Sequence, residues 1–509
     1  MSKARAVRPE LLTLLVSLAF LLFYNLPLWQ RLLAITPAGW QGLGMMLAVG
    51  LMIAAIFNLA LTLLAFRWLL KPALTLLILA AAGTTYFMTQ YGVLMDVGML
   101  RNVMQTNPAE VADLLSPKLA VYLALLGALP VWLLWRTPVR YRPWPRELLS
   151  KLLVALACLA LLAGVALANY QGLSSLFRNN KELRLQVTPS NLVGAAIGYA
   201  KGQAQAASQP LRPIAVDARR ADLWQGHARK SLTVLVVGES ARAQNFGLNG
   251  YARETNPRLK AEEGLINFSN VHSCGTETAV SVPCMFSNLG RADYSDARAR
   301  TQEGLLDVLQ RAGLRVLHQM GSHGPAYFKR YPREYEKFTP VCASNDFSAC
   351  SRDSIINGYD NTLLYTDHVL ASLIDLLRKN EERIDTGMLY LSDHGESLGE
   401  YNLYLHGTPY LLAPDQQKHV GMLAWFSPGY QSAFGLDSSC LRQRSNEELS
   451  QDNLFHSMLG LLEVRTGAYD PGLDLFAPCR APEVLQALKA DGGRALYSEE
   501  ASGQEPPAS

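Results

Sequence analysis

Long apolar runs fill the first third of the chain, and shorter ones alternate with polar segments after it. A helix needs about 20 mainly apolar residues to cross a bilayer core about 30 Å thick. Five runs approach or exceed that length: Leu11 to Trp29, Gly42 to Phe66, Leu69 to Val93, Leu119 to Trp135 and Leu152 to Ala168. They predict five transmembrane helices. The first is too long for a cleaved signal peptide and no small-residue cleavage site follows it, so we expect it to stay as an anchor.

Basic residues gather at the N-terminus, between the second and third runs, and between the fourth and fifth. Lys and Arg accumulate on the cytoplasmic side of membrane proteins. This pattern predicts a cytoplasmic N-terminus and an exported chain after Tyr170. We therefore expect a multi-pass membrane protein with its large domain outside the cytoplasm, and in a Gram-negative inner membrane that domain would face the periplasm.

The pattern changes to α/β type in the second half. Thr233 to Val237 and Met388 to Leu391 are continuous apolar runs, typical of strands buried on both faces, and Asn361 to Arg378 has helical spacing. The predicted organisation is a transmembrane domain over 1–170, a membrane-surface bridge and linker over 171–216, a periplasmic α/β domain over 217–490 and a disordered tail over 491–509.

Composition and charge support the membrane interpretation. Only 17% of the residues are charged, against about 25% in ordinary soluble proteins. The 46 basic and 43 acidic residues give a net charge of +3, which does not indicate a nucleic-acid partner.

Six of the seven cysteines follow the last predicted span. An even number in an oxidising compartment predicts three disulfides. Cys274 with Cys284 and Cys342 with Cys350 are close in sequence and are the natural partners. The pair of Cys440 with Cys479 follows by elimination.

Two polar clusters follow the predicted strands. Glu239 comes after Val237, and Asp393 and His394 come after Leu391. Open α/β sheets place their ligand sites at the carboxyl ends of strands. Two carboxylates and an imidazole are ligands of zinc type, so the clusters predict a metal site with a free position for a nucleophile or substrate.

Several further side chains could serve this site. Thr276, Thr278 and Ser281 lie within the short Cys274 to Cys284 segment, where a hydroxyl could be held rigidly at a helix start; simple helix capping is the alternative. Glycine-containing loops carry three histidines that suit a second cation site or a general acid: His318, His323 and His406.

Long strings in this sequence resemble the lipid A phosphoethanolamine transferases, the enzymes behind intrinsic and mobile resistance to polymyxins such as colistin. The strings are VVGESARAQNFGLNGY, SCGTETAVSVPCMFS, HQMGSHGPAYFKRY, IINGYDN, YLSDHGESLGE and YLHGTP. The resemblance implies five spans before a periplasmic domain of alkaline-phosphatase and sulfatase type. It also implies one zinc ion, with a second as an alternative.

The resemblance assigns roles to individual residues. It implies Glu239, Asp393 and His394 as zinc ligands and Thr278 as the nucleophile that is also a ligand. His323 and His406 match the donor or second-metal site, and His318 is expected to contact substrate. A polar helical face after the third span is implied in binding the phosphoethanolamine group: Asn102, Thr106 and Glu110.

The implied reaction moves phosphoethanolamine from phosphatidylethanolamine to a phosphate of lipid A through a phosphothreonine-type intermediate, in a monomeric enzyme. One alternative keeps the reaction and changes the acceptor to core heptose, Kdo or periplasmic glucan. A second is a hydrolytic sulfatase or phosphodiesterase. A third is an inactive homologue that binds lipid or regulates a paralogue.

The sequence departs from the family at two places. About sixty residues with a substrate-binding Lys are missing near Leu317, so Arg315 to Met320 is predicted to form one strand that still delivers His323 beside the metal. We expect an exposed apolar patch, weakened donor binding and reduced stability from this loss. Gln451 stands where the family usually has His.

Overall fold

The computed structural model describes residues 6–105, 111, 114–312, 317–318 and 322–488. The chain divides into two compact units. The first comprises Met1–Lys201 together with Cys342–Ser351 and Gly399–Gly407, and the second comprises the remaining segments. The first unit therefore takes up most of the expected bridge and two later segments that the sequence pattern assigned to the α/β domain.

Most of the first unit is helical, and its later segments include the short strand β8 (Tyr404–Leu405). Its main helices are α1 (Pro9–Phe23), α2 (Leu26–Ile35), α3 (Trp40–Leu63), α4 (Leu70–Tyr91), α5 (Val97–Gln105), α7 (Pro117–Tyr122), the π-helix η1 (Leu123–Ala128), α8 (Leu129–Arg136), α9 (Trp144–Ala168), α10 (Tyr170–Asn179), the 3-10 helix η2 (Lys181–Gln186) and the start of α11 (Ser190–Ser208). Among the described residues, four helical stretches are long and apolar enough to span a membrane, or five if the bent pair α1 and α2 counts as one.

The first predicted span is not one straight helix. α1 and α2 meet at a bend of 58°, and Asn25 between them leaves the helical conformation. Its side-chain amide donates to the carbonyls of Phe20 (2.9 Å) and Thr188 (2.7 Å) and accepts from the N–H of Thr188 (2.8 Å). Hydropathy cannot reveal this break, because the apolar run continues through it and the partner Thr188 lies far along the chain.

The helices of the first unit bury a core of their own. Both α1 and α9 pack against α3, and Leu70, Leu74 and Ile78 of α4 are buried in this core. Much of α9 is apolar yet exposed, for example Leu152 and Leu156. Exposed leucines at this density suit a helix surrounded by lipid.

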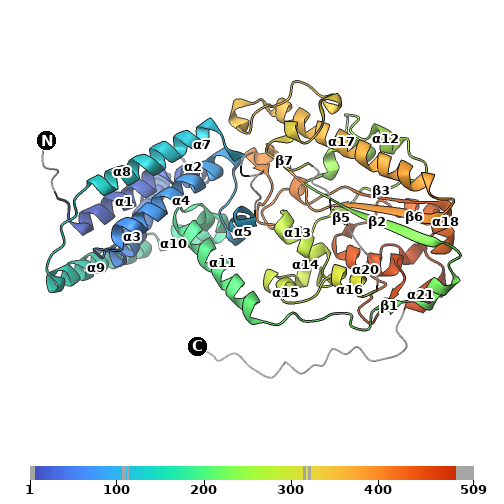
Figure 1. Cartoon of the computed structure of the whole chain (residues 1–509). Helices are drawn as coiled ribbons and strands as arrows, with labels where there is room; N and C mark the ends of the chain where they lie inside the picture. Colours follow the sequence, from blue (N-terminus) through green and yellow to red (C-terminus); the bar gives the residue numbers. More distant parts are fainter. Residues whose placement is uncertain (1–5, 106–110, 112–113, 313–316, 319–321, 489–509) are drawn as a thin grey trace. The chain divides into compact units, whose positions relative to one another are not determined.

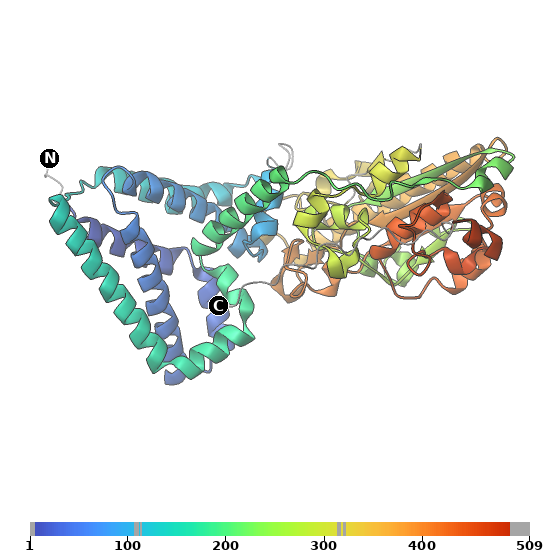
Figure 2. The same cartoon turned by 90° about the horizontal axis from the view of Figure 1, so that it is seen from below.

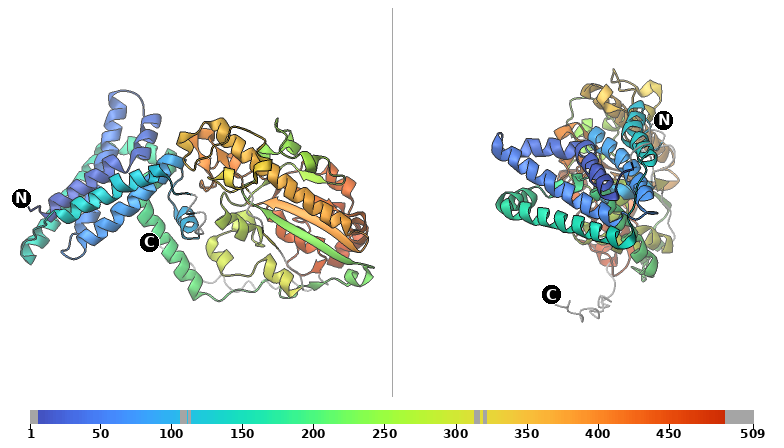
Figure 3. Two further views of the ribbon diagram at one scale, coloured as in Figure 1. Left: turned by 45° about the horizontal axis from the view of Figure 1, so that its top comes forward. Right: turned by 90° about the vertical axis from the view of Figure 1, so that its left-hand side faces the viewer.

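A five-stranded sheet organises the second unit. Its order is β3 (Ile266–Phe268), β9 (Met422–Phe426), β6 (Ile384–Ser392), β2 (Lys230–Gly238) and β5 (Leu317–His318). The strands β2, β5 and β6 are parallel, whereas β9 is antiparallel to both of its neighbours. β2 (green) and β6 (orange) run side by side in the left view of Figure 3, with Gly238 opposite Ser392. Both predicted strands lie within this pair.

Helices cover both faces of the sheet, as an α/β fold requires. The long α17 (Arg352–Lys379) lies on one face and contains the predicted helical segment (Figure 1). On the other face, α16 (Leu305–Arg311) and α20 (Asp452–Leu461) share a core with β2, β6 and β9. The view from below in Figure 2 turns this second face towards the viewer. Buried side chains of that core include Leu235, Leu389 and Phe455.

Short elements complete the second unit. The helices are α12 (Pro257–Lys260), α13 (Thr278–Met285), α14 (Gly290–Asp293), α15 (Asp296–Arg300), α18 (Pro428–Ala433), α19 (Ser438–Gln443) and α21 (Pro482–Leu488). β1 (Arg219–Arg220) pairs with β11 (Val464–Arg465), and β4 (Val271–His272) pairs in parallel with β10 (Leu449–Ser450).

The shortened region lies at the β5 edge of the sheet. Leu317 and His318 pair with Val236 and Val237, and the flanking residues of the predicted strand lie outside the described residues. Near the start of β2, Leu232 is 44% exposed, whereas its partner Thr386 on β6 is fully buried. The exposed apolar patch expected at the shortened region stays a prediction.

The structure contains three disulfides, joining Cys274 to Cys284, Cys342 to Cys350 and Cys440 to Cys479. The second closes a loop within the first unit. Tyr91 donates its hydroxyl hydrogen to the carbonyl of Asn345 (2.8 Å), and Lys118 donates to Ser348 Oγ (2.6 Å). The disulfide therefore restricts a segment that the helices hold at several points.

We expect the double variant Cys342→Ser, Cys350→Ser to lose about 2.5 kcal/mol of stability, because the unfolded loop regains conformational freedom. The unfolding midpoint in detergent should fall, and hydrogen exchange at 342–351 should rise. The matched variant Cys440→Ser, Cys479→Ser lies in the other unit and should leave exchange at 342–351 unchanged. Equal exchange in the first variant and in the unmodified protein would contradict this expectation.

Candidate metal centre

The ends of β2 and β6 bring three charged side chains together. Because Gly238 pairs with Ser392, the residues that follow leave the sheet at the same edge. His394 Nε2 lies 3.2 Å from Glu239 Oε1 and 3.3 Å from Asp393 Oδ2. All three residues are buried, and each offers a ligand atom within 4.8 Å of the others. The sequence prediction that these residues converge agrees with this geometry.

Thr278 is the hydroxyl that faces this cluster. Its Oγ1 lies 3.1 Å from Glu239 Oε2 and 3.2 Å from His394 Nε2. The other two candidate hydroxyls are engaged elsewhere: Thr276 donates to the carbonyl of Thr408 (2.7 Å), and Ser281 accepts from the N–H of Gly275 (3.0 Å). The first turn of α13 thus presents Thr278 to the three charged groups.

The electrostatics of the cluster are unfavourable without a cation. Burial raises the pKa of the Asp393 carboxyl, and the Glu239 carboxylate raises it further. Burial alone lowers the pKa of His394, but the Asp393 and Glu239 carboxylates outweigh this effect and raise that pKa. Two buried carboxylates at this separation repel each other, and a bound divalent cation would neutralise both.

Hydrogen bonding in the cluster also fits a metal ion. Asp393 Oδ2 is buried and accepts no hydrogen bond from the described part of the chain. His394 Nδ1 lies 2.8 Å from the carbonyl of Gly395. When Nδ1–H donates to that carbonyl, Nε2 presents its lone pair to the cluster, which is the usual arrangement for a metal-bound imidazole. The residues present therefore fit a divalent cation.

Two supporting residues were not predicted from the sequence. Ser240 has a positive φ of 56°, and it donates from Oγ to Glu239 Oε1 (2.8 Å) and from its N–H to Asp393 Oδ1 (3.0 Å). The Tyr359 hydroxyl donates to the Ser240 carbonyl (2.6 Å) and thereby helps to hold this conformation. No sequence pattern indicates that a serine will adopt a positive φ, so the sequence contained no signal for the role of Ser240.

The remaining predicted residues are placed less completely. Ser322 donates its N–H to the carbonyl of Glu239 (2.9 Å), which brings the adjacent His323 to the β2 end of the sheet. His318 pairs through its backbone in β5, and nothing is described of its side chain. His406 and Asn102 belong to the first unit. Thr106 and Glu110 lie outside the described residues.

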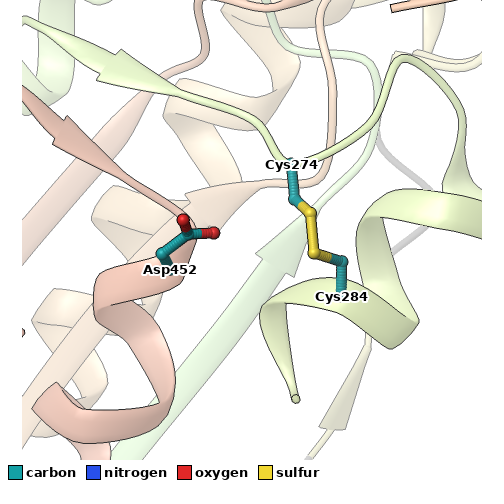
Figure 4. Close-up of side chains that lie close together, drawn as sticks. All are labelled: Cys274, Cys284 and Asp452. Carbon is teal, nitrogen blue, oxygen red and sulfur yellow. A yellow bond between two sulfur atoms is a disulfide. The ribbon is translucent and has the colours of Figure 1, made fainter. Parts of the chain in front are cut away.

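A second group of potential ligand atoms lies nearby. Figure 4 shows Asp452, at the start of α20, beside the disulfide of Cys274 and Cys284. The bonded sulfur atoms are not thiolates, and Asp452 Oδ1 accepts from the N–H of Arg291 (2.8 Å). This group is therefore a structural junction rather than a metal centre.

Comparisons with known proteins agree with this fold and cluster. Residues 53–204 match the family model of the phosphoethanolamine transferases EptA/EptB, and residues 231–316 and 314–464 match the sulfatase family model. The second unit is thus a sulfatase-type domain, attached to a helical domain of transferase type.

Relatives match over most of the chain. The phosphoethanolamine transferase EptA of Escherichia coli K12 is 38% identical over 94% of this chain and 99% of its own length. The phosphatidylethanolamine transferase Mcr-1 of Escherichia coli is 36% identical over 83% and 90%. The integral membrane lipooligosaccharide phosphoethanolamine transferase A of Neisseria meningitidis matches with a TM-score of 0.90 and 32% identity over 94% and 100%. This chain belongs to the phosphoethanolamine transferase family.

The comparison also supports the expected internal shortening. The alignment with the Escherichia coli K12 protein extends over 549 residues, whereas 94% of the 509 residues here is only about 478. About 70 aligned positions thus have no counterpart in this chain. The two sulfatase matches meet at residues 314–316, beside the predicted junction at Leu317.

Proposed function

We propose that this protein is a zinc-dependent transferase of a Gram-negative inner membrane that moves phosphoethanolamine from phosphatidylethanolamine to a lipid A phosphate. Its catalytic domain faces the periplasm, and the modification protects the cell against polymyxins. The main support is the Thr278 hydroxyl beside a buried Glu239, Asp393 and His394 cluster that fits a divalent cation. The names of the relatives support phosphoethanolamine as the transferred group, and the lipid A acceptor rests on the resemblance of the sequence strings.

The first half of the reaction transfers the group to the protein. Thr278 Oγ attacks the donor phosphorus, and Glu239 Oε2, 3.1 Å away, is placed to accept the hydroxyl proton. The new Oγ–P bond replaces the P–O bond to diacylglycerol, whose oxygen takes a proton from His323 or His406. A bound zinc ion would lower the pKa of Thr278 and offset negative charge on the phosphoryl oxygens.

The second half regenerates the enzyme. A phosphate oxygen of lipid A attacks the same phosphorus, the Oγ–P bond breaks, and Thr278 Oγ takes back the proton that Glu239 had accepted. Asn102, Thr106 and Glu110 are proposed to bind the phosphoethanolamine group, with His318 at the substrate. A monomeric state completes the proposal, and a second zinc ion at His323 and His406 is the alternative to their role as general acid.

The acceptor has a specific competitor. The Kdo(2)-lipid A phosphoethanolamine 7''-transferase of Salmonella typhimurium is 27% identical over 77% of this chain. This enzyme is less similar to the chain than EptA, which is 38% identical over 94% of it, so we keep a Kdo acceptor as the competitor and not as the proposal. The retained cluster and Thr278 weigh against an inactive homologue.

Mass spectrometry of lipid A and core from a strain that lacks its own transferases tests this proposal. With the protein, we expect one added phosphoethanolamine on a lipid A phosphate and a higher colistin tolerance. Phosphoethanolamine added to Kdo or heptose would show that the proposed acceptor is wrong. Unmodified lipopolysaccharide, although the protein is correctly inserted in the membrane, would refute the transfer reaction itself. Cells expressing Thr278→Ala at equal level provide the baseline.

A further inference from the structure

One buried amide connects the segment of Thr278 with the turn of the metal-ligating residues. The side chain of Gln451, immediately before α20, is fully buried. Its Oε1 accepts from the N–H of Cys274 (2.7 Å), and its Nε2 donates to the carbonyls of Ser392 (2.9 Å) and Asp393 (2.6 Å). All three contacts are to backbone groups.

The two ends of this connection belong to separate parts of the second unit. Cys274 begins the disulfide-closed segment that contains Thr278, whereas Ser392 ends β6 and is followed by Asp393 and His394. The backbone N–H of Gln451 adds a fourth bond, to the carbonyl of His272 (2.9 Å). Gln451 therefore fixes the start of the nucleophile segment against the turn that supplies two ligands.

The neighbouring residue anchors the same helix end on its other side. Asp452 lies beside the Cys274–Cys284 disulfide in Figure 4 and accepts from the N–H of Arg291 at the start of α14. The start of α20 is thus held in place from outside the metal cluster, so Gln451 acts from a fixed support. A displacement of this helix end would therefore reach Thr278 and Asp393, and a misplacement of about 1 Å can lower a rate about 100-fold.

The chemistry of the three contacts calls for an amide. The three contacts need one acceptor and two N–H donors in one plane. Only the planar amides of Gln and Asn carry an acceptor oxygen and an NH₂ group together. A carboxylate would keep the contact to Cys274 and place an oxygen against two carbonyls. A methionine of similar size would fill the space and make none of the three bonds.

We propose that Gln451 is a positioning residue, which holds Thr278 and the ligand turn of Asp393 in the geometry that transfer requires. The inference rests on the proposed function for its catalytic consequence. It concerns no new contact with substrate, because the Gln451 side chain is wholly enclosed and its bonds go to the backbone. Its effect on chemistry is exerted through other residues.

The test compares Gln451→Met, Gln451→Glu and Gln451→His in the full chain in detergent. Gln451→Met should lower kcat for a short-chain phosphatidylethanolamine donor by 10- to 100-fold, the usual cost of losing support behind metal ligands. KM should stay within about twofold, because donor contacts are untouched. Exchange of the Cys274 amide hydrogen should rise, and zinc affinity measured with a competing chelator should fall.

The other variants separate the two ends of the connection. Gln451→Glu keeps an acceptor for the Cys274 N–H, so exchange of that amide hydrogen should stay slow. Zinc affinity should fall, because the donors to the carbonyls of Ser392 and Asp393 are lost. Gln451→His offers one acceptor and one donor and should recover most of the kcat that Gln451→Met loses. The matched control is Gln431→Met on α18, where Nε2 donates to the carbonyl of Phe426 (2.8 Å). It should leave kcat, Cys274 exchange and zinc affinity unchanged.

The outcomes distinguish this inference from the function on which it rests. Unchanged kcat, exchange and zinc affinity in Gln451→Met, with only a lower unfolding midpoint, would show that Gln451 is merely structural and overturn the inference. If the unmodified protein transfers nothing, the proposed function fails, yet faster Cys274 exchange and weaker zinc binding in Gln451→Met would still support the positioning role.

Discussion

The Thr278→Ala variant is expected to fold, bind zinc and transfer no phosphoethanolamine, with activity reduced by at least about a thousand-fold. The hydroxyl lies within 3.2 Å of both Glu239 Oε2 and His394 Nε2, and no other described hydroxyl of the segment faces them. Removing a nucleophile abolishes the covalent route altogether and leaves only slow background reaction. Stability should change by no more than about 1 kcal/mol, since only one hydroxyl is lost.

Two companion variants make this result specific. Thr278→Ser keeps a hydroxyl at the same position and should retain measurable transfer and a phosphorylated peptide in a rapid-quench digest. Thr276→Val removes the bond to the carbonyl of Thr408 and should reduce activity far less than Thr278→Ala. Substantial transfer by Thr278→Ala would move the nucleophile to Thr276 or Ser281, the alternatives that the sequence had left open.

The core of the second unit was predictable because its central strands contain continuous apolar runs: β6 is buried on both faces, and β2 is buried towards its carboxyl end. The apolar runs at 233–237 and 388–391 lie in the parallel strands β2 and β6, and the helical spacing at 361–378 lies in α17. The position of the cluster followed from the same reasoning, since Glu239 and Asp393 come directly after strand ends that are adjacent in the sheet. Periodicity and chain order were sufficient for these features.

Features that depend on distant partners were not predictable in this way. The bend at Asn25 depends on hydrogen bonds to Thr188, and the positive φ of Ser240 depends on Tyr359 and Asp393. The segments 342–351 and 399–407 have compositions like their neighbours, yet they pack within the helical unit. The sequence showed Gln451 only as a departure from a family pattern, whereas its four hydrogen bonds explain what it does.

Removal of zinc should have the second large effect, on stability. A ligand present at a thousand times its dissociation constant stabilises the folded state by about 4 kcal/mol. We therefore expect a chelator to lower the unfolding midpoint strongly and zinc to restore it. Glu239→Gln should lose this response, because one of the charged ligand groups is gone.

The free energy of unfolding should change with pH in opposite directions in the metal-free and the zinc-bound protein. In the metal-free protein the pKa of Asp393 and that of His394 are both raised above their unfolded values. Protonation then favours folding, so metal-free stability falls as pH rises through the raised pKa values. Zinc binds the deprotonated ligands, so the stabilisation that it adds grows with pH. Calorimetry of both forms from pH 5 to about pH 8 should show that the difference in stability between the zinc-bound and the metal-free protein increases with pH. A difference that stays constant or decreases would mean that zinc is not bound by Asp393 and His394.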